Sequence, residues 1–403
     1  MNQEYMKILN QMAAEAVREL DAIRHPSAGA RAKNLAKSLI GRGSANISDP
    51  IFWPAGLLLT GLMETGHTGS PDLRKYSSSV EEYLAGWLRQ DAPVRNPDDA
   101  LTGSVVLELY AQTGNPAYKE AADKIAAYLK GCLRDANGSI IYGQQSGNSR
   151  IYADGTGMTA MFLARYSRIL GAENQENAKA AGSSPETSER YDPMSDARIQ
   201  LLNYARYGMD VRSGLPYHAY DTENGLKLGI IGWGRAVGWL LLGLSEYLIC
   251  NPDDEELADF SQTILNAVSD RVRPDGMLSW QLDCMEGPLD TSATGMIFYA
   301  MLRMNRALPS IPDTSLSDFT ASASLPAKAP HACPEQSGVP WIDSSLLDAA
   351  ALALRECVTE DGKVYWCSAE CIDIAQYSQQ FGHYSWGQAA VLAFLALYES
   401  CPT

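Results

Sequence analysis

The 403-residue chain contains 46% hydrophobic and 20% charged residues, a composition typical of an ordinary globular protein. Its formal net charge is −16 and no basic block offsets the acidic residues, which excludes nucleic acids and anionic membranes as expected partners. The first twenty residues lack the apolar core of a signal peptide, and no run of about 18 apolar residues occurs. A cytoplasmic location is therefore expected.

Helical periodicity dominates the chain, whereas the alternation typical of strands is scarce. About twelve helices are predicted, and two kinds alternate. The first kind has one charged face and one apolar stripe; its members are 3–23, 71–90, 115–131, 192–206, 253–270 and 343–357. The second kind is apolar nearly all round and rich in small residues; its members are 53–66, 98–114, 153–170, 232–248, 290–306 and 383–400. Helices of the second kind belong in an interior.

The six apolar segments resemble one another, because each carries a glycine in its first turns and continues as an aliphatic or aromatic run. Self-similarity at a loose period of roughly 50 residues is typical of repeat architectures. The pattern predicts an all-α fold, an (α/α)6 barrel with six inner helices ringed by six outer ones. Residues 1–403 then form a single catalytic domain. Two polar segments, at about 171–191 and 308–340, are predicted to be long loops.

The stretch RIYADGTGMTA, which begins at Arg150, has two interpretations. A strand followed by Gly155 and Gly157 would match a dinucleotide-binding turn, which also requires a βαβ unit and an acidic residue about 20 residues later. A polar segment follows instead, so we reject this interpretation. The alternative drops the strand and makes the stretch a buried inner helix, with glycines that permit close helix packing and Asp154 at the end where the inner helices begin.

The eight cysteines are scattered, and reduced thiols are expected. Zinc ligands could be drawn from Cys367, Cys371 and His383, or from His331 and Cys333. These spacings match no common zinc motif, so no metal site is predicted.

Several polar and aromatic residues stand near the starts of inner helices: Asp98, Asp154, His218, Trp233, Arg235, Trp239 and Asp290. Each has a simpler role when taken alone, because aspartate is a favoured helix cap and tryptophan at helical spacing usually packs in a core. Together they suit a sugar acid. Paired carboxyl groups supply proton transfer, arginine binds a carboxylate through two hydrogen bonds, and aromatic faces stack on sugar rings.

Four segments carry a family resemblance: NPDDALTGSVVLELYAQTG, YADGTGMTAMFLARY, GLPYHAYDTE and WGRAVGW. From about residue 50 onward the chain resembles glycoside hydrolase family 105, the unsaturated rhamnogalacturonyl hydrolases, with the unsaturated glucuronyl hydrolases as relatives. The resemblance implies that Asp154 and Asp98 are catalytic, and it places His218, Trp233, Arg235 and Trp239 at substrate-binding positions. No metal or organic cofactor is implied. An asparagine of the family pattern near Asp98 is absent here.

The reaction implied by the resemblance removes a 4,5-unsaturated uronic acid from the non-reducing end of oligosaccharides made by lyases. Asp154 would protonate C4, water would add at C5, and the resulting hemiketal would open and release the next sugar. A rhamnogalacturonan-type disaccharide is the expected substrate. Three alternatives stay open: an unsaturated glucuronyl hydrolase acting on other lyase products, a sugar 2-epimerase, and a non-catalytic carbohydrate-binding protein on the same scaffold.

Overall fold

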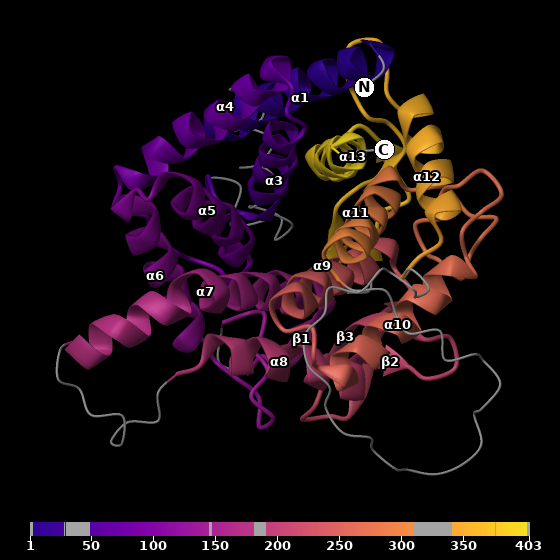
Figure 1. Ribbon diagram of the computed structural model, residues 1–403. Helices are drawn as coiled ribbons and strands as arrows, with labels where there is room; N and C mark the ends of the chain where they lie inside the picture. Colours follow the sequence, from indigo (N-terminus) through magenta and orange to yellow (C-terminus); the bar gives the residue numbers. More distant parts are fainter. Residues whose placement is uncertain are drawn as a thin grey trace, which may run out of the picture.

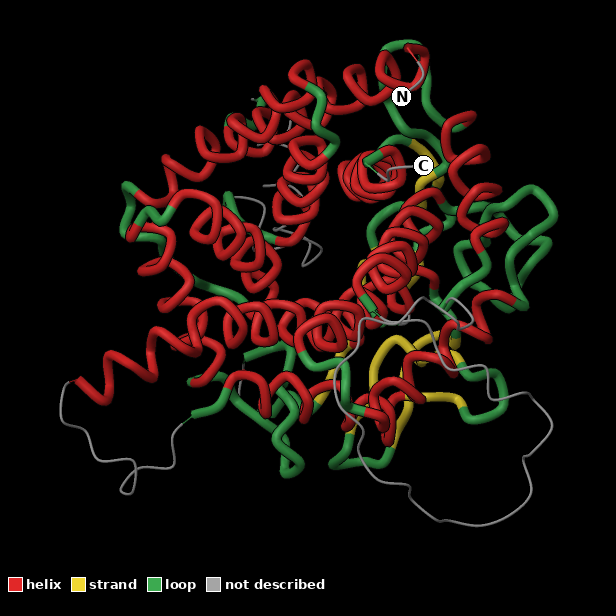
Figure 2. The backbone as a smooth tube through the Cα atoms, viewed as in Figure 1, coloured by secondary structure: helices red, strands yellow, loops and turns green. Residues whose placement is uncertain are grey.

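The computed structural model describes residues 3–27, 29, 49–144, 147–180, 191–308, 341–374 and 376–400. Within these ranges it contains twelve α-helices, arranged as two concentric rings (Figures 1 and 2). The inner ring consists of α3 (Trp53–His67), α5 (Ala100–Thr113), α7 (Ala153–Ala180), α9 (Gly234–Cys250), α11 (Thr291–Ala307) and α13 (Ser385–Glu399). The ring closes because each inner helix contacts the next in chain order, and α13 contacts α3. The predicted (α/α)6 barrel is confirmed.

The outer ring consists of α1 (Gln3–Arg24), α4 (Pro71–Leu88), α6 (Pro116–Lys130), α8 (Pro193–Asn203), α10 (Glu255–Ser269) and α12 (Ser344–Glu356). Local sequence starts these helices. Asn115 accepts a hydrogen bond from the backbone N–H of Ala117 at 3.1 Å, and Asp192 accepts one from Met194 at 3.0 Å. A proline follows each of these two caps, at a position where no helical N–H is needed. Capping and amphipathicity together explain why these helices could be predicted from sequence.

The glycines of the stretch around Asp154 serve helix packing. At Gly157 on α7, a Cβ atom would lie 2.1 Å from the backbone oxygen of Trp239 on α9. At Gly243, farther along α9, a Cβ would lie 2.8 Å from the backbone oxygen of Gly157. The two helix backbones therefore touch at these positions, and any side chain would force them apart.

A short sheet lies against the inner helices α7 and α9. Its strands are β1 (Arg150–Tyr152), β2 (Met209–Asp210), β3 (Leu215–Asp221) and β4 (Leu226–Ile231), and β3 pairs antiparallel with the other three. Strand β1 directly precedes α7, so the interpretation that dropped this strand was wrong on that point. Because β1 and β3 are antiparallel, however, the unit is no βαβ nucleotide fold. Two smaller pairs, β5 (Cys367–Ser368) with β8 (Phe381–Gly382) and β6 (Cys371–Asp373) with β7 (Gln376–Tyr377), precede α13.

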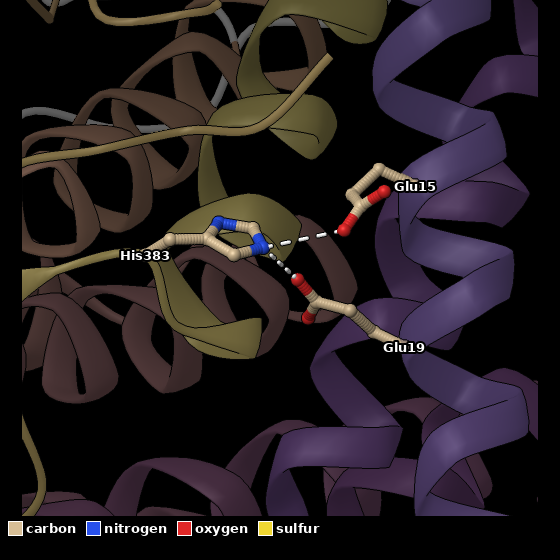
Figure 3. Close-up of side chains that lie close together, drawn as sticks. All are labelled: Glu15, Glu19 and His383. Carbon is tan, nitrogen blue, oxygen red and sulfur yellow. Dashed lines mark ion pairs between the residues drawn. The ribbon is translucent and has the colours of Figure 1, made fainter. Parts of the chain in front are cut away.

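Helix α1 is joined to the segment before α13 by an ion-pair cluster (Figure 3). The His383 Nε2 atom lies 2.7 Å from a Glu19 oxygen and 3.4 Å from a Glu15 oxygen, while Nδ1 lies 3.0 Å from the backbone oxygen of Val364. Burial alone would lower the pKa of His383, but Glu19, the Val364 carbonyl and Glu15 outweigh it and raise the pKa above its usual range. An imidazolium that donates from both nitrogens fits these partners. The zinc set considered above is not assembled around His383.

The two predicted loops lie mostly outside the described residues. Helix α7 continues to Ala180, ten residues into the segment expected to be a loop from 171 to 191. Residues 181–190 and 309–340 fall outside the described ranges. Among the helices that are described, none has the length and apolar character needed to cross a bilayer.

Candidate active site

The barrel end with the helix starts holds the two predicted catalytic carboxyl groups. Asp98 lies in the 3-10 turn η1 (Pro97–Asp99) immediately before α5, and Asp154 lies in the first turn of α7. His218 lies on β3, and Trp233 is the residue immediately before α9. A carboxylate is favourable in the first turn of a helix because unpaired backbone N–H groups point toward it.

Asp154 and His218 are in direct contact. The His218 Nε2 atom lies 3.1 Å from Asp154 Oδ2, and the His218 Nδ1 atom lies 2.9 Å from the hydroxyl of Tyr377. The His218 side chain is 3% exposed, whereas that of Asp154 is 18% exposed. Asp154 is therefore the member of this pair that a ligand can reach.

Asp98 is buried beside Asp154. It is 1% exposed, and its Oδ2 atom accepts a hydrogen bond from Tyr142 at 2.7 Å. Burial raises the pKa of Asp98 to about 8; the Tyr142 hydrogen bond opposes the rise, and the charges of Asp154 and Asp99 add to it. Asp98 is consequently protonated at neutral pH. The Oδ1 atoms of both Asp98 and Asp154 are shielded from solvent and have no hydrogen-bond partner in the described part of the chain.

Aromatic rings surround this pair. Trp233 packs on the His218 ring at 4.4 Å, and Trp239 meets Trp53 edge-on at 6.1 Å. Trp233 and Trp239 are only 4% and 3% exposed, so their contacts are those of packed residues. Trp53 and Trp386 lie 5.3 Å apart and are partly exposed, which makes them more accessible than Trp233 and Trp239.

Arg235 is occupied by protein groups. It is 2% exposed and donates to the backbone oxygen of Ser368 at 2.9 Å, to the Ser368 hydroxyl at 2.5 Å and to the backbone oxygen of Ala369 at 2.8 Å. Asp290 lies 3.8 Å away, caps α11 through the N–H of Ser292, and accepts a hydrogen bond from the Ser368 hydroxyl at 2.6 Å. The Arg235 guanidinium therefore links β5 to α9 through hydrogen bonds. Asp290 acts as the N-terminal cap of α11.

Sequence reasoning missed Tyr142 and Tyr377, which contact Asp98 and His218. Both lie in connecting segments outside the predicted helices, and neither has a spacing relationship to the acidic residues. The hairpin that carries His218 did leave a signal. Asn224 and Gly225 form a turn pair typical of hairpins, and Gly225 has a φ of +62°.

One described group of side chains has metal-ligand character, and it lies away from the acids. The ligand atoms of Glu15, Glu19 and His383 are within 4.8 Å of one another (Figure 3). The His383 Nε2 atom faces both carboxylates, while its Nδ1 atom faces the Val364 carbonyl.

Comparison with known proteins places the chain in a family. The sequence model of Glycosyl Hydrolase Family 88 matches residues 30–311. The chain belongs to glycosyl hydrolase family 88. Solved structures that share its fold include proteins described as members of family 105, so the predicted resemblance is confirmed at the level of families 88 and 105 together.

Three solved structures illustrate how this family 88 protein folds. A possible member of family GH105 from Salmonella enterica serovar Paratyphi A has a TM-score of 0.67 and 15% identity, covering 86% of this chain and 82% of that one. A family 105 glycoside hydrolase from C. acetobutylicum has a TM-score of 0.63 and 19% identity, covering 92% and 99%. The unsaturated glucuronyl hydrolase from Bacillus sp. GL1 has a TM-score of 0.59 and 17% identity, covering 85% of each chain. These likenesses establish the α/α barrel.

Curated relatives match a shorter stretch of this family 88 chain. Protein Atu3128 of Agrobacterium fabrum is 29% identical over 134 residues, which is 30% of this chain and 57% of that protein. The 24.9 kDa protein in the picA locus of Rhizobium radiobacter matches to the same extent. The chain thus spans little more than half the length of these two relatives.

Proposed function

We propose that the protein removes a 4,5-unsaturated uronic acid from the non-reducing end of oligosaccharides by hydrating the C4=C5 bond. The observation that carries this proposal is the pairing of a buried, neutral Asp98 with a partly exposed Asp154 in contact with His218. Membership in glycosyl hydrolase family 88 supports it independently.

The first step is proton transfer to carbon. The C4=C5 bond is an enol ether, and its π electrons form a new C4–H bond with a proton from the Asp98 and Asp154 pair. Asp154 delivers this proton because Asp98 is buried and Asp154 is accessible. The transfer leaves positive charge on C5 and the ring oxygen.

The second step is addition of water. The water oxygen bonds to C5 while its proton passes to Asp154, which restores the proton of the pair. The C5 hemiketal then opens as the bond between C5 and the ring oxygen breaks, and C5 becomes a ketone. Opening turns C1 into a hemiacetal that expels the neighbouring sugar. One water is consumed, and neither carboxyl group attacks the anomeric carbon, so the carboxyl-separation rule for glycosidases does not apply.

For the substrate we propose a rhamnogalacturonan-type disaccharide. The partly exposed rings of Trp53 and Trp386 lie 5.3 Å apart and offer a compact stacking surface, which suits a small substrate. A glucuronyl disaccharide from another lyase is the closest competitor, because it carries the same reacting ring.

The positions of the histidines do not favour the sugar 2-epimerase alternative. A sugar 2-epimerase would use two histidines as acid and base. His218 contacts Asp154, whereas the other histidine near the start of an inner helix, His383, faces Glu15 and Glu19 on α1. The two imidazoles therefore have separate partners.

Incubation with unsaturated disaccharides prepared by several lyases tests the proposal. We expect loss of the ultraviolet absorbance of the double bond together with release of one leaving sugar per double bond, fastest for the rhamnogalacturonan product. The matching saturated disaccharides are the control and should stay intact. Release of sugar with the absorbance unchanged would contradict hydration of the double bond.

A further inference from the structure

We propose that Tyr377 is a positioning residue that holds His218 in the tautomer with a protonated Nε2, so that this nitrogen donates a hydrogen bond to Asp154. The inference rests on the proposed role of Asp154 in proton transfer. Tyr377 comes from the segment between α12 and α13, and it has no contact with Asp154 described here; its action passes through His218.

The direction of the hydrogen bonds follows from counting donors. The backbone N–H of Ile230 donates to the Tyr377 oxygen at 3.2 Å. The phenol has a single proton of its own, and the His218 Nδ1 atom lies 2.9 Å from it. Burial raises the pKa of Tyr377 above its usual range, so the phenol keeps this proton. Among the described residues, Nδ1 is the acceptor within hydrogen-bond distance of this proton, so the tyrosine donates and Nδ1 accepts.

An imidazole that accepts at Nδ1 carries its proton on Nε2. The Nε2 atom lies 3.1 Å from Asp154 Oδ2, a hydrogen-bonding distance for this N–H donor. In the other tautomer, the Nε2 lone pair would face the lone pairs of the Asp154 Oδ2 atom and repel them. The chain from Ile230 through Tyr377 and His218 thus fixes the orientation of the Asp154 carboxyl group.

Three aromatic rings and the backbone at Gly229 hold Tyr377 in position. Its ring lies against Trp233 at 5.7 Å, Trp280 at 6.0 Å and His218 at 5.7 Å. Gly229 on β4 has a φ of +81°, and a Cβ there would lie 2.4 Å from the Tyr377 hydroxyl and 2.7 Å from the His218 Cβ. Only glycine lets the β4 backbone pass close enough for the Ile230 N–H to reach the phenol.

Nitrogen-15 NMR of histidine-labelled protein tests the tautomer directly, because the chain has only five histidines. We expect the His218 ring of the wild-type protein at neutral pH to show a protonated Nε2 and an unprotonated Nδ1, with the signals assigned through the His218→Gln variant. In Tyr377→Phe we expect the Nδ1-protonated form to become populated. Tyr207→Phe, which removes an exposed phenol whose hydrogen bond goes to Asn137, should leave the His218 signals unchanged.

The kinetic readout separates positioning from binding. Tyr377→Phe should lower kcat about tenfold, the effect of losing one orienting hydrogen bond, with KM close to the wild-type value. A wild-type His218 ring that is protonated at Nδ1, or at both nitrogens, would overturn the inference, as would an unchanged tautomer in Tyr377→Phe. The NMR result needs no substrate, so it stands even if every disaccharide in the panel is left intact and the proposed function fails.

Discussion

Replacing Asp98 with asparagine tests the buried neutral acid on which the proposed chemistry depends. The carboxyl group is 1% exposed, and burial raises its pKa from 3.8 to about 8. Asparagine has nearly the same shape and can still accept the hydrogen bond from Tyr142, but it has no proton to lose. The variant therefore removes titration at this position with little change in packing.

The sign and size of the effect follow from linkage. Because the folded pKa is raised, the stabilising contribution of a neutral Asp98 is complete below pH 3.8 and is lost as the pH rises toward 8. Within this window, each rise of one pH unit lowers the free energy of unfolding of the wild-type protein by about 1.4 kcal/mol, and by slightly less near pH 8. Between pH 5 and pH 8 the free energy of unfolding of the wild type should thus fall by about 3–4 kcal/mol relative to Asp98→Asn.

Urea unfolding of both proteins at pH 5 and pH 8 measures this difference. Leu58→Ala is the control, since Leu58 is fully buried and has no titrating group; its loss of about 2–5 kcal/mol should be the same at both pH values. A difference between wild type and Asp98→Asn that stays constant from pH 5 to pH 8 would refute a neutral Asp98.

Three further predictions concern packing and charge. Gly157→Ala should lower the free energy of unfolding by about 1–3 kcal/mol in urea, because its Cβ would meet the Trp239 backbone; stability equal to wild type would contradict the close helix contact. Arg235→Lys should cost about 1–3 kcal/mol, because an ammonium group cannot reproduce the fork of donors to Ser368 and Ala369, and an unchanged melting temperature would argue against that fork. Hydrogen bonds to Glu108 and Glu64 raise the pKa of His67 to about 10, so its stabilising effect should be full below pH 6.5 and vanish above pH 10; a melting-temperature gap between His67→Asn and wild type that persists above pH 10 would contradict this.

The barrel itself could be predicted from sequence because the relevant physics is local. Apolar segments that begin with small residues identify inner helices, and prolines with aspartate or asparagine caps mark the outer ones. All six observed inner helices start within two residues of the predicted starts. Asp98 and Asp154 could be expected at one end of the barrel for the same reason, since both stand at inner helix starts.

The rest of the site depends on pairings between distant segments. Tyr142 reaches Asp98 from 44 residues away, and Tyr377 reaches His218 from 159 residues away, so no local pattern connects them. Arg235 is a second case of pairing between distant segments. Its type and position predict a ligand for a substrate carboxylate, and in the structure it donates hydrogen bonds to Ser368 and Ala369, more than 130 residues later. Sequence spacing cannot show whether a polar group is already satisfied inside the fold.

The central claim is that the carboxyl group of Asp154 exchanges a proton with C4 of an unsaturated uronic acid. Turnover of an unsaturated disaccharide by Asp154→Asn, followed by the absorbance of the double bond, tests it most directly. The account predicts loss of activity by a factor of about 100 or more, with the protein still folded, because the amide cannot donate an acidic proton. An Asp154→Asn variant that consumes the double bond at the wild-type rate would contradict the account.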